Sequence, residues 1–213
     1  MLTVHHLRRS QSERIVWLCE ELEIPYTLRS YDRDPVTRLA TPEYKRLHPI
    51  GAAPVIDDDG RVLAESGAIV DYVVAKFGAG HLTLAVDHPD FATYLYWLHF
   101  ANGNLQPNVG RNMILGRLAL PADDPTLVAT RGRLRLALEF MDRHLAGSIW
   151  LAGAEFTIAD VMTVFSLTTM RLFHPFDLGP YAQIRAYLQR IGERPAYRAA
   201  MAKGDPGMKP MLE

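Results

Sequence analysis

Hydrophobic and polar positions in the first part of the chain follow two periodicities. Leu2–Leu7 is typical of a short strand, and Glu13–Leu22 carries its apolar residues on one stripe at helical spacing. Ser12 precedes that helix, and we expect its side chain to cap the first turn. Tyr26–Tyr31 then predicts a second strand. A strand, a helix and a strand in so few residues predict a parallel βαβ unit.

The pattern continues with a short helix, a hairpin and a longer helix. Asp57-Asp58-Asp59-Gly60 joins the two hairpin strands, and Gly60 is free to take the positive φ that such a turn needs. The order βαβ followed by ββα is that of a thioredoxin-like α/β domain, which we assign to residues 1–79. The expected elements of this second part are Thr41–Tyr44, Pro54–Ile56, Arg61–Ala64 and Ser66–Phe77.

After Pro89 the apolar positions recur only at helical spacing. We therefore predict an all-α helical bundle as a second domain, residues 87–213. Thr157 and Asp160 form a capping-box arrangement, which should start a buried helix. The tail from Gly204 is expected to be irregular. The expected helical stretches are Phe91–Leu118, Pro125–Leu145, Ile158–Phe173, Tyr181–Ile191 and Ala196–Ala202.

Composition and charge narrow the class of function. A formal net charge of −1 over 213 residues gives no case for binding nucleic acid or an anionic membrane. Cys19 is the single cysteine and cannot form an internal disulfide, which fits a reducing compartment. With neither a signal-peptide pattern nor a membrane-spanning stretch, we expect a cytoplasmic protein. His5 and His6 are adjacent on a strand, so their rings diverge, and we predict no metal site.

Four local motifs, in their order along the chain, give the sequence a family resemblance. They are Ser10-Gln11-Ser12-Glu13-Arg14, His48-Pro49-Ile50-Gly51-Ala52-Ala53-Pro54, Ala64-Glu65-Ser66-Gly67-Ala68-Ile69 and Phe156-Thr157-Ile158-Ala159-Asp160. With an α/β half before a helical half, the chain resembles a cytosolic glutathione transferase along nearly its whole length. Leu2–Leu7 and Trp97-Leu98-His99-Phe100 are most similar to bacterial and fungal enzymes of the serine-using branch. The resemblance implies glutathione as co-substrate and a homodimer with each site near the interface.

The chemistry of such an enzyme requires a thiolate, because the thiolate is the nucleophile. A hydroxyl at the N-terminus of a helix lowers a thiol pKa, since it donates to the sulfur anion where the helix dipole favours negative charge. Ser10 stands at that junction, four residues before Arg14, and the resemblance implies that it is the catalytic serine. Ser12 is the alternative, although we favour a capping role for it. For Arg14 we favour a structural ion pair.

Glutathione itself would be held by backbone and side-chain groups of the first domain. The resemblance implies a cis bond between Ala53 and Pro54, which turns the N–H and C=O of Ala53 toward the cysteinyl backbone. Glu65 and Ser66 precede a helix, and the first N–H groups of a helix form an anion site. In relatives this pair holds the γ-glutamyl end.

Several positions depart from the family pattern. Ala52 stands where a lysine is common and His48 where an amide is common, while Asn102 replaces a frequent acidic residue. The substitutions at Ala52 and Asn102 remove charges that could meet glutathione. Phe100 and Phe173 are candidates for the electrophile pocket.

We therefore expect a transferase that adds the glutathione thiolate to an electrophilic, largely apolar small molecule. A glutathione-dependent isomerase, peroxidase or dehalogenase is an alternative, since the same thiolate serves each reaction. The isomerase branch usually has Ser-Cys in the first loop, whereas Gln11 follows Ser10 here. A non-catalytic glutathione-binding module is a second alternative.

Overall fold

The computed structural model describes all 213 residues. Their internal contacts divide the chain into two compact units. The first comprises residues 1–82 and 192–210, and the second comprises residues 83–191 and 211–213. A segment near the C-terminus thus belongs to the same unit as the N-terminal residues.

The first unit contains a four-stranded sheet whose strand order is β2-β1-β3-β4. β1 pairs with β2 in parallel and with β3 antiparallel, while β3 and β4 are antiparallel. The predicted parallel βαβ unit is therefore confirmed. The strands are β1 (Leu2–Leu7), β2 (Thr27–Tyr31), β3 (Val55–Asp58) and β4 (Arg61–Ala64).

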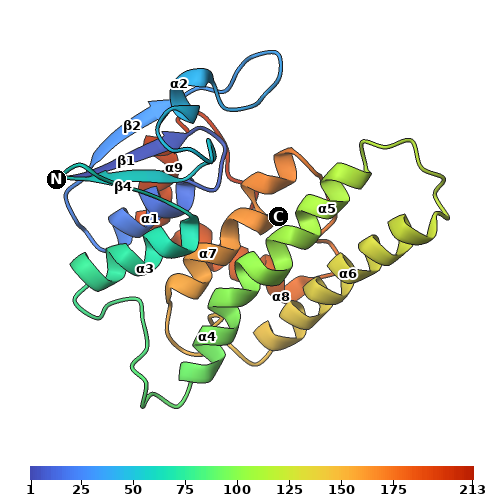
Figure 1. Cartoon of the computed structure of the whole chain (residues 1–213). Helices are drawn as coiled ribbons and strands as arrows, with labels where there is room; N and C mark the ends of the chain where they lie inside the picture. The colour runs from blue at the N-terminus through green and yellow to red at the C-terminus, as the bar shows by residue number, and fades with distance from the viewer. The chain divides into compact units, whose positions relative to one another are not determined.

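Four helices complete the first unit: α1 (Glu13–Glu21), α2 (Pro42–Lys45), α3 (Ser66–Phe77) and α9 (Pro195–Gly204). Figure 1 shows α1 and α3 on one side of the sheet and α2 on the other. α1 packs directly against α9, where the ring centroids of Trp17 and Tyr197 lie 5.0 Å apart. Arg194 and Glu21 close this contact with an ion pair of 2.6 Å. α9 is therefore an integral part of the α/β unit.

The hairpin turn follows from its sequence. Asp59 and Gly60 have φ values of 50° and 87°, the left-handed backbone of a two-residue hairpin turn, as predicted for Gly60. Buried Asp58, just before the turn, accepts a hydrogen bond from Tyr72 at 2.6 Å and pairs with Lys76. These contacts fix the hairpin to α3.

The second unit is all-helical, as predicted. Its segments are α4 (Phe91–Phe100), the π-helical η1 (Ala101–Leu105), α5 (Gln106–Leu115), α6 (Pro125–Leu145), α7 (Ile158–Leu167), the 3₁₀ segment η2 (Thr169–Leu172) and most of α8 (Ala182–Glu193). Every residue of α7 is buried, and α7 packs against α4. None of the helices combines the length and hydropathy that a membrane crossing requires.

Two predicted helical stretches are interrupted. The stretch Phe91–Leu118 contains the π-helical η1, because Pro107 has no N–H to donate to the carbonyl of Gly103. The stretch Ile158–Phe173 breaks at Thr168, whose backbone leaves the helical region at φ −122° and ψ −98°. α9 also extends through Gly204, two residues beyond the predicted end of its helix.

Candidate functional site

Ser10 lies in the loop that joins β1 to α1. Arg9 before it has a φ of 55°, and this left-handed residue turns the chain toward the helix. The Ser10 carbonyl accepts from the Glu13 N–H at 3.0 Å, so Ser10 stands at the positive end of α1. Its side chain is largely buried, and its Oγ accepts from the Ser12 N–H at 3.2 Å.

Ser12 does not cap α1 with its side chain, and that prediction is wrong. Its backbone is already helical, at φ −67° and ψ −15°, whereas a capping serine usually has an extended backbone. The hydroxyl therefore points back to β1. Ser12 Oγ lies 2.8 Å from Ser10 Oγ and 2.9 Å from His6 Nδ1, and it accepts from the Leu7 N–H at 3.1 Å.

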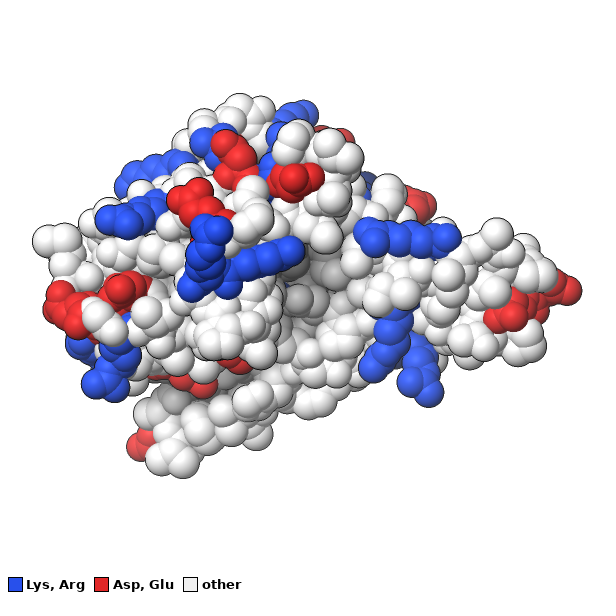
Figure 2. All heavy atoms as spheres, turned by 45° about the horizontal axis from the view of Figure 1, so that its top comes forward, with Lys and Arg blue, Asp and Glu red and all other residues white.

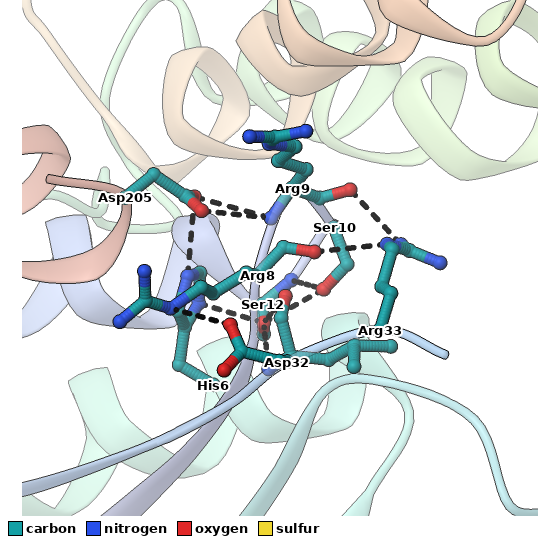
Figure 3. Close-up of polar contacts among 9 residues, drawn as sticks. His6, Arg8, Arg9, Ser10, Ser12, Asp32, Arg33 and Asp205 are labelled. Carbon is teal, nitrogen blue, oxygen red and sulfur yellow. Dashed lines mark hydrogen bonds and ion pairs between the residues drawn. The ribbon is translucent and has the colours of Figure 1, made fainter. Parts of the chain in front are cut away.

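His6 and Asp205 extend this cluster to the end of α9 (Figure 3). His6 is completely buried, and its Nε2 lies 3.2 Å from Asp205 Oδ2. The Arg9 N–H donates to both carboxylate oxygens of Asp205, at 3.0 and 3.2 Å. Neither His6 nor Asp205 was a predicted site residue. The alternation of β1 places His6 on the face of Val4, and only that pattern hinted at its burial.

Ala53 and Pro54 are joined by a cis bond, as predicted. The Gln11 side-chain amide donates to the Ala53 carbonyl at 2.7 Å and accepts from Arg14 Nη1 at 2.9 Å. The same Arg14 nitrogen donates to Ser66 Oγ at 3.3 Å. Gln11 and Arg14 thus bring together the loop of Ser10, the segment of Ala53 and the start of α3.

Arg14 is completely buried, and burial lowers the pKa of its guanidinium to about 9, although the nearby charges of Glu13 and Glu65 oppose the shift. A buried cation needs hydrogen bonds and neighbouring negative charge to remain ionised. Arg14 therefore has the structural role that we expected, with bonds to Gln11 and Ser66.

Glu65 precedes α3 with a φ of 74°, a conformation that L-residues rarely adopt. Its side chain is exposed and makes no capping hydrogen bond to α3. Ser66, the first residue of α3, is buried. A non-glycine residue held in the left-handed region is a frequent mark of a ligand site.

The remaining candidates belong to the second unit, apart from Ala52, which is exposed in the first. Phe100 stacks with Tyr96, at 5.8 Å between ring centroids, and lines a cavity of 540 Å³ with Phe140. Asn102 is half-buried within η1. Phe173 is half-buried directly after η2.

Metal and cysteine chemistry receive no support from this geometry. His5 and His6 diverge, because His5 Nδ1 contacts Tyr31 Oη at 2.8 Å on the other face of the sheet. No group of three His, Cys, Asp or Glu side chains is placed to hold a metal ion. Cys19 is buried, and burial raises the pKa of its thiol to about 12. In Figure 2, basic and acidic side chains are interspersed over the face in view.

An α/β unit with a βαβ-ββα order followed by an all-helical unit defines a class of two-domain proteins, and sequence comparison identifies the family. The family described as "Glutathione S-transferase, N-terminal domain" matches residues 1–75, and "Glutathione S-transferase, C-terminal domain" matches residues 110–195. The chain therefore belongs to the glutathione S-transferase family, with a thioredoxin-like first domain.

Individual relatives agree with this assignment. Glutathione S-transferase 3 of Schizosaccharomyces pombe is 32% identical over 95% of this chain and 88% of its own length. The disulfide-bond oxidoreductase YfcG of Escherichia coli is 28% identical over 97% of each chain. The crystal structure of a glutathione S-transferase from Actinobacillus pleuropneumoniae superposes with a TM-score of 0.88, at 31% identity over 96% of this chain and 93% of that one.

Proposed function

We propose that this protein binds glutathione in its first domain, residues 1–79, and adds the thiolate to an electrophilic, largely apolar small molecule held by residues 87–213. The observation that carries the proposal is the position of Ser10. Its largely buried hydroxyl lies at the N-terminal end of α1, within hydrogen-bonding distance of other groups in the β1–α1 loop. A donor in that place stabilises a sulfur anion both directly and together with the helix dipole.

The other glutathione contacts in this proposal come from groups that the first unit gathers around the same loop. The N–H and C=O of Ala53 pair with the cysteinyl backbone, and Gln11 already marks that carbonyl as an exposed acceptor, at 2.7 Å. Ser66 and the first N–H groups of α3 meet the γ-glutamyl carboxylate, and Glu65 meets the amine. Pro54 fixes the turn, and Asn102 is the contact that we propose from the second unit.

A second candidate function is thiol–disulfide chemistry, because one relative is a disulfide-bond oxidoreductase. Such a reaction would use glutathione as its thiol. The chain's own Cys19 is buried and has a raised pKa, so it is a poor nucleophile. A disulfide substrate assayed beside an aryl halide distinguishes the two candidate activities.

We also propose, on the family resemblance, a cytoplasmic homodimer of the serine-using branch. Analytical ultracentrifugation tests the oligomeric state. A monomer at micromolar concentration would contradict this part of the proposal and leave the chemistry untouched.

The deciding experiment compares Ser10→Ala with the native protein in turnover of a generic aryl halide and in glutathione calorimetry. We expect turnover to fall about a hundredfold, as when one hydrogen bond to a developing anion is lost. Glutathione affinity should change little, since the hydroxyl acts mainly on the charged sulfur. Ser30→Ala, at an exposed serine of β2, is the control. Unchanged turnover in Ser10→Ala, or binding without turnover of several electrophiles by the native protein, would contradict the assignment.

A further inference from the structure

A continuous series of buried hydrogen bonds connects Ser10 to a carboxylate at the end of α9 (Figure 3). The atoms follow the order Ser10 Oγ, Ser12 Oγ, His6 Nδ1, His6 Nε2 and Asp205 Oδ2. The three separations are 2.8, 2.9 and 3.2 Å, and all four side chains are buried. The residues at the two ends are 195 positions apart in sequence, yet both belong to the first unit.

The chemistry of each partner assigns the protons. The Asp205 carboxylate only accepts, so His6 carries a proton on Nε2, and neutral His6 then accepts at Nδ1. The Ser12 hydroxyl donates to that Nδ1, because its oxygen already accepts from the Leu7 N–H. The Ser10 hydroxyl must therefore donate to Ser12 Oγ. In this resting arrangement every proton points from Ser10 toward Asp205.

The resting arrangement leaves Ser10 Oγ as an acceptor. One lone pair accepts from the Ser12 N–H at 3.2 Å, and the other is open to a ligand. An acceptor suits a thiol S–H group, whereas a thiolate requires a donor. Ser10 must consequently reverse its hydrogen bond when the thiol ionises.

We propose that His6, oriented by Asp205, is the base that receives the glutathione thiol proton, through Ser12 and Ser10. The S–H bond breaks as that proton bonds to Ser10 Oγ, the Ser10 proton moves to Ser12 Oγ, and the Ser12 proton moves to His6 Nδ1. The products are a thiolate and an imidazolium, so charge is conserved. Ser10 now donates to sulfur and Ser12 donates to Ser10. This inference rests on the proposed glutathione function of Ser10.

The surroundings of His6 suit a base that becomes charged in a buried place. Asp205 is held at both oxygens by the Arg9 N–H, so its carboxylate stays aimed at the ring. Gly204 allows the approach, because a Cβ there would lie 3.1 Å from His6 Nε2. A carboxylate beside a histidine stabilises the imidazolium, the same arrangement that orients the histidine of a serine protease.

The other charged groups of this region lie around the loop after β1. Arg33 donates to the carbonyls of Arg8 and Arg9, each at 2.9 Å, and Arg8 contacts Asp32 at 3.3 Å. Asp205 is the carboxylate that contacts His6 directly. The arginines therefore oppose a positive His6, and Asp205 opposes their effect.

The proposal makes a stoichiometric prediction for the native protein. Glutathione is mixed with the enzyme near pH 7 (about one unit or more below an ordinary thiol pKa) in weak buffer with a pH indicator. Ultraviolet absorbance of the same mixture reports the thiolate. We expect thiolate to form with well under one proton released per site, because His6 keeps the proton. Release of one proton for each thiolate would overturn the proposal without affecting the proposed function, whereas no thiolate at any pH would overturn both.

Variants identify the group that keeps the proton. In His6→Asn, the amide oxygen still accepts from Ser12 but binds no proton. We expect one proton released per thiolate, less thiolate near pH 7, and turnover lowered about tenfold or more. The loss should shrink as pH rises, whereas a purely structural role would lower turnover equally at every pH. Asp205→Asn should act in the same direction.

The matched control is His5→Asn, which changes the neighbouring histidine of β1 on the opposite face, where it contacts Tyr31. It should retain the native proton count and pH profile. A His6→Asn variant that matches the native protein in both readouts would overturn the proposal. If His6→Asn fails to fold, the proton count of the native protein decides the question alone.

Discussion

Glu65 concentrates two properties in one residue: a left-handed backbone at φ 74° and an exposed carboxylate at the start of α3. A side chain in that backbone region costs roughly 1–2 kcal/mol. The adjacent Ser66 is buried and accepts from Arg14, so the strained residue is held by a firm neighbour. At the residue scale, the start of α3 therefore fits a ligand contact better than a simple helix cap.

Ala52 provides a prediction at the same scale, because it is exposed and a longer side chain meets no packing constraint. Ala52→Lys should tighten glutathione binding, since the ammonium can meet the glycyl carboxylate. An ion pair worth ~0.2–3 kcal/mol, depending on burial, corresponds to a gain from slight to roughly a hundredfold. Calorimetry at low and high salt measures it, and the gain should shrink at high salt.

Glutathione amidated at its glycyl end is the control ligand, and it should show no gain with Ala52→Lys. An unchanged affinity for glutathione at low salt would mean that another cation already meets the carboxylate. The departure at Ala52 would then have no effect on binding.

At the scale of elements, α7 depends on the predicted Thr157–Asp160 capping box, which the structure confirms. Asp160 is completely buried and accepts from the Thr157 N–H at 2.9 Å. It also accepts from the Leu151 N–H and the Tyr187 hydroxyl, each at 3.0 Å. One carboxylate thus fixes the start of α7, the loop before it and α8.

We predict that Asp160→Ala lowers the free energy of unfolding by about 3–5 kcal/mol, because three buried donors lose their acceptor at roughly 1–3 kcal/mol each. Urea unfolding followed by circular dichroism measures the loss. Asp124→Ala removes the half-buried cap of α6, which accepts from Thr126 and Leu127, and should cost only about 1 kcal/mol. Equal losses in the two variants would contradict the special role of Asp160.

At the scale of the whole molecule, the first unit is discontinuous in sequence. Residues 192–210 supply α9, which covers α1 and carries Asp205. Trp17 of α1 and Tyr197 and Met201 of α9 are each less than 5% exposed. The N-terminal residues therefore cannot complete their own core.

We predict that a fragment of residues 1–82 is much less stable than the same residues joined by a flexible linker to residues 192–210. Exposure of each large apolar side chain costs about 1.5–3 kcal/mol, so loss of α9 removes several kcal/mol. Trp17 is the single tryptophan of both fragments, so its fluorescence in urea reports the unfolding. Coincident unfolding curves would show that α9 is dispensable to the first unit.

The sequence by itself determined the features that depend on residues close together in the chain. Alternation predicted β1 at its observed bounds, helical spacing predicted α3 at its observed bounds, and Gly60 predicted the positive φ of the hairpin turn. The capping box of α7 was equally visible, because Thr157 and Asp160 are three positions apart. Such signals are local, since the backbone conformation of one turn or strand brings their partners together.

Only the tertiary structure decided which distant groups meet. Ser12 has the identity and position of a cap, yet its hydroxyl bonds to β1 and Ser10, because α1 packs close to that strand. His6 read as one half of a divergent histidine pair, and Asp205 as part of an irregular tail. Their bond exists because α9 returns to the first unit and Gly204 lets it approach the ring. Periodicity shows that a polar residue is buried, but the partner that stabilises it comes from packing of segments far apart in sequence.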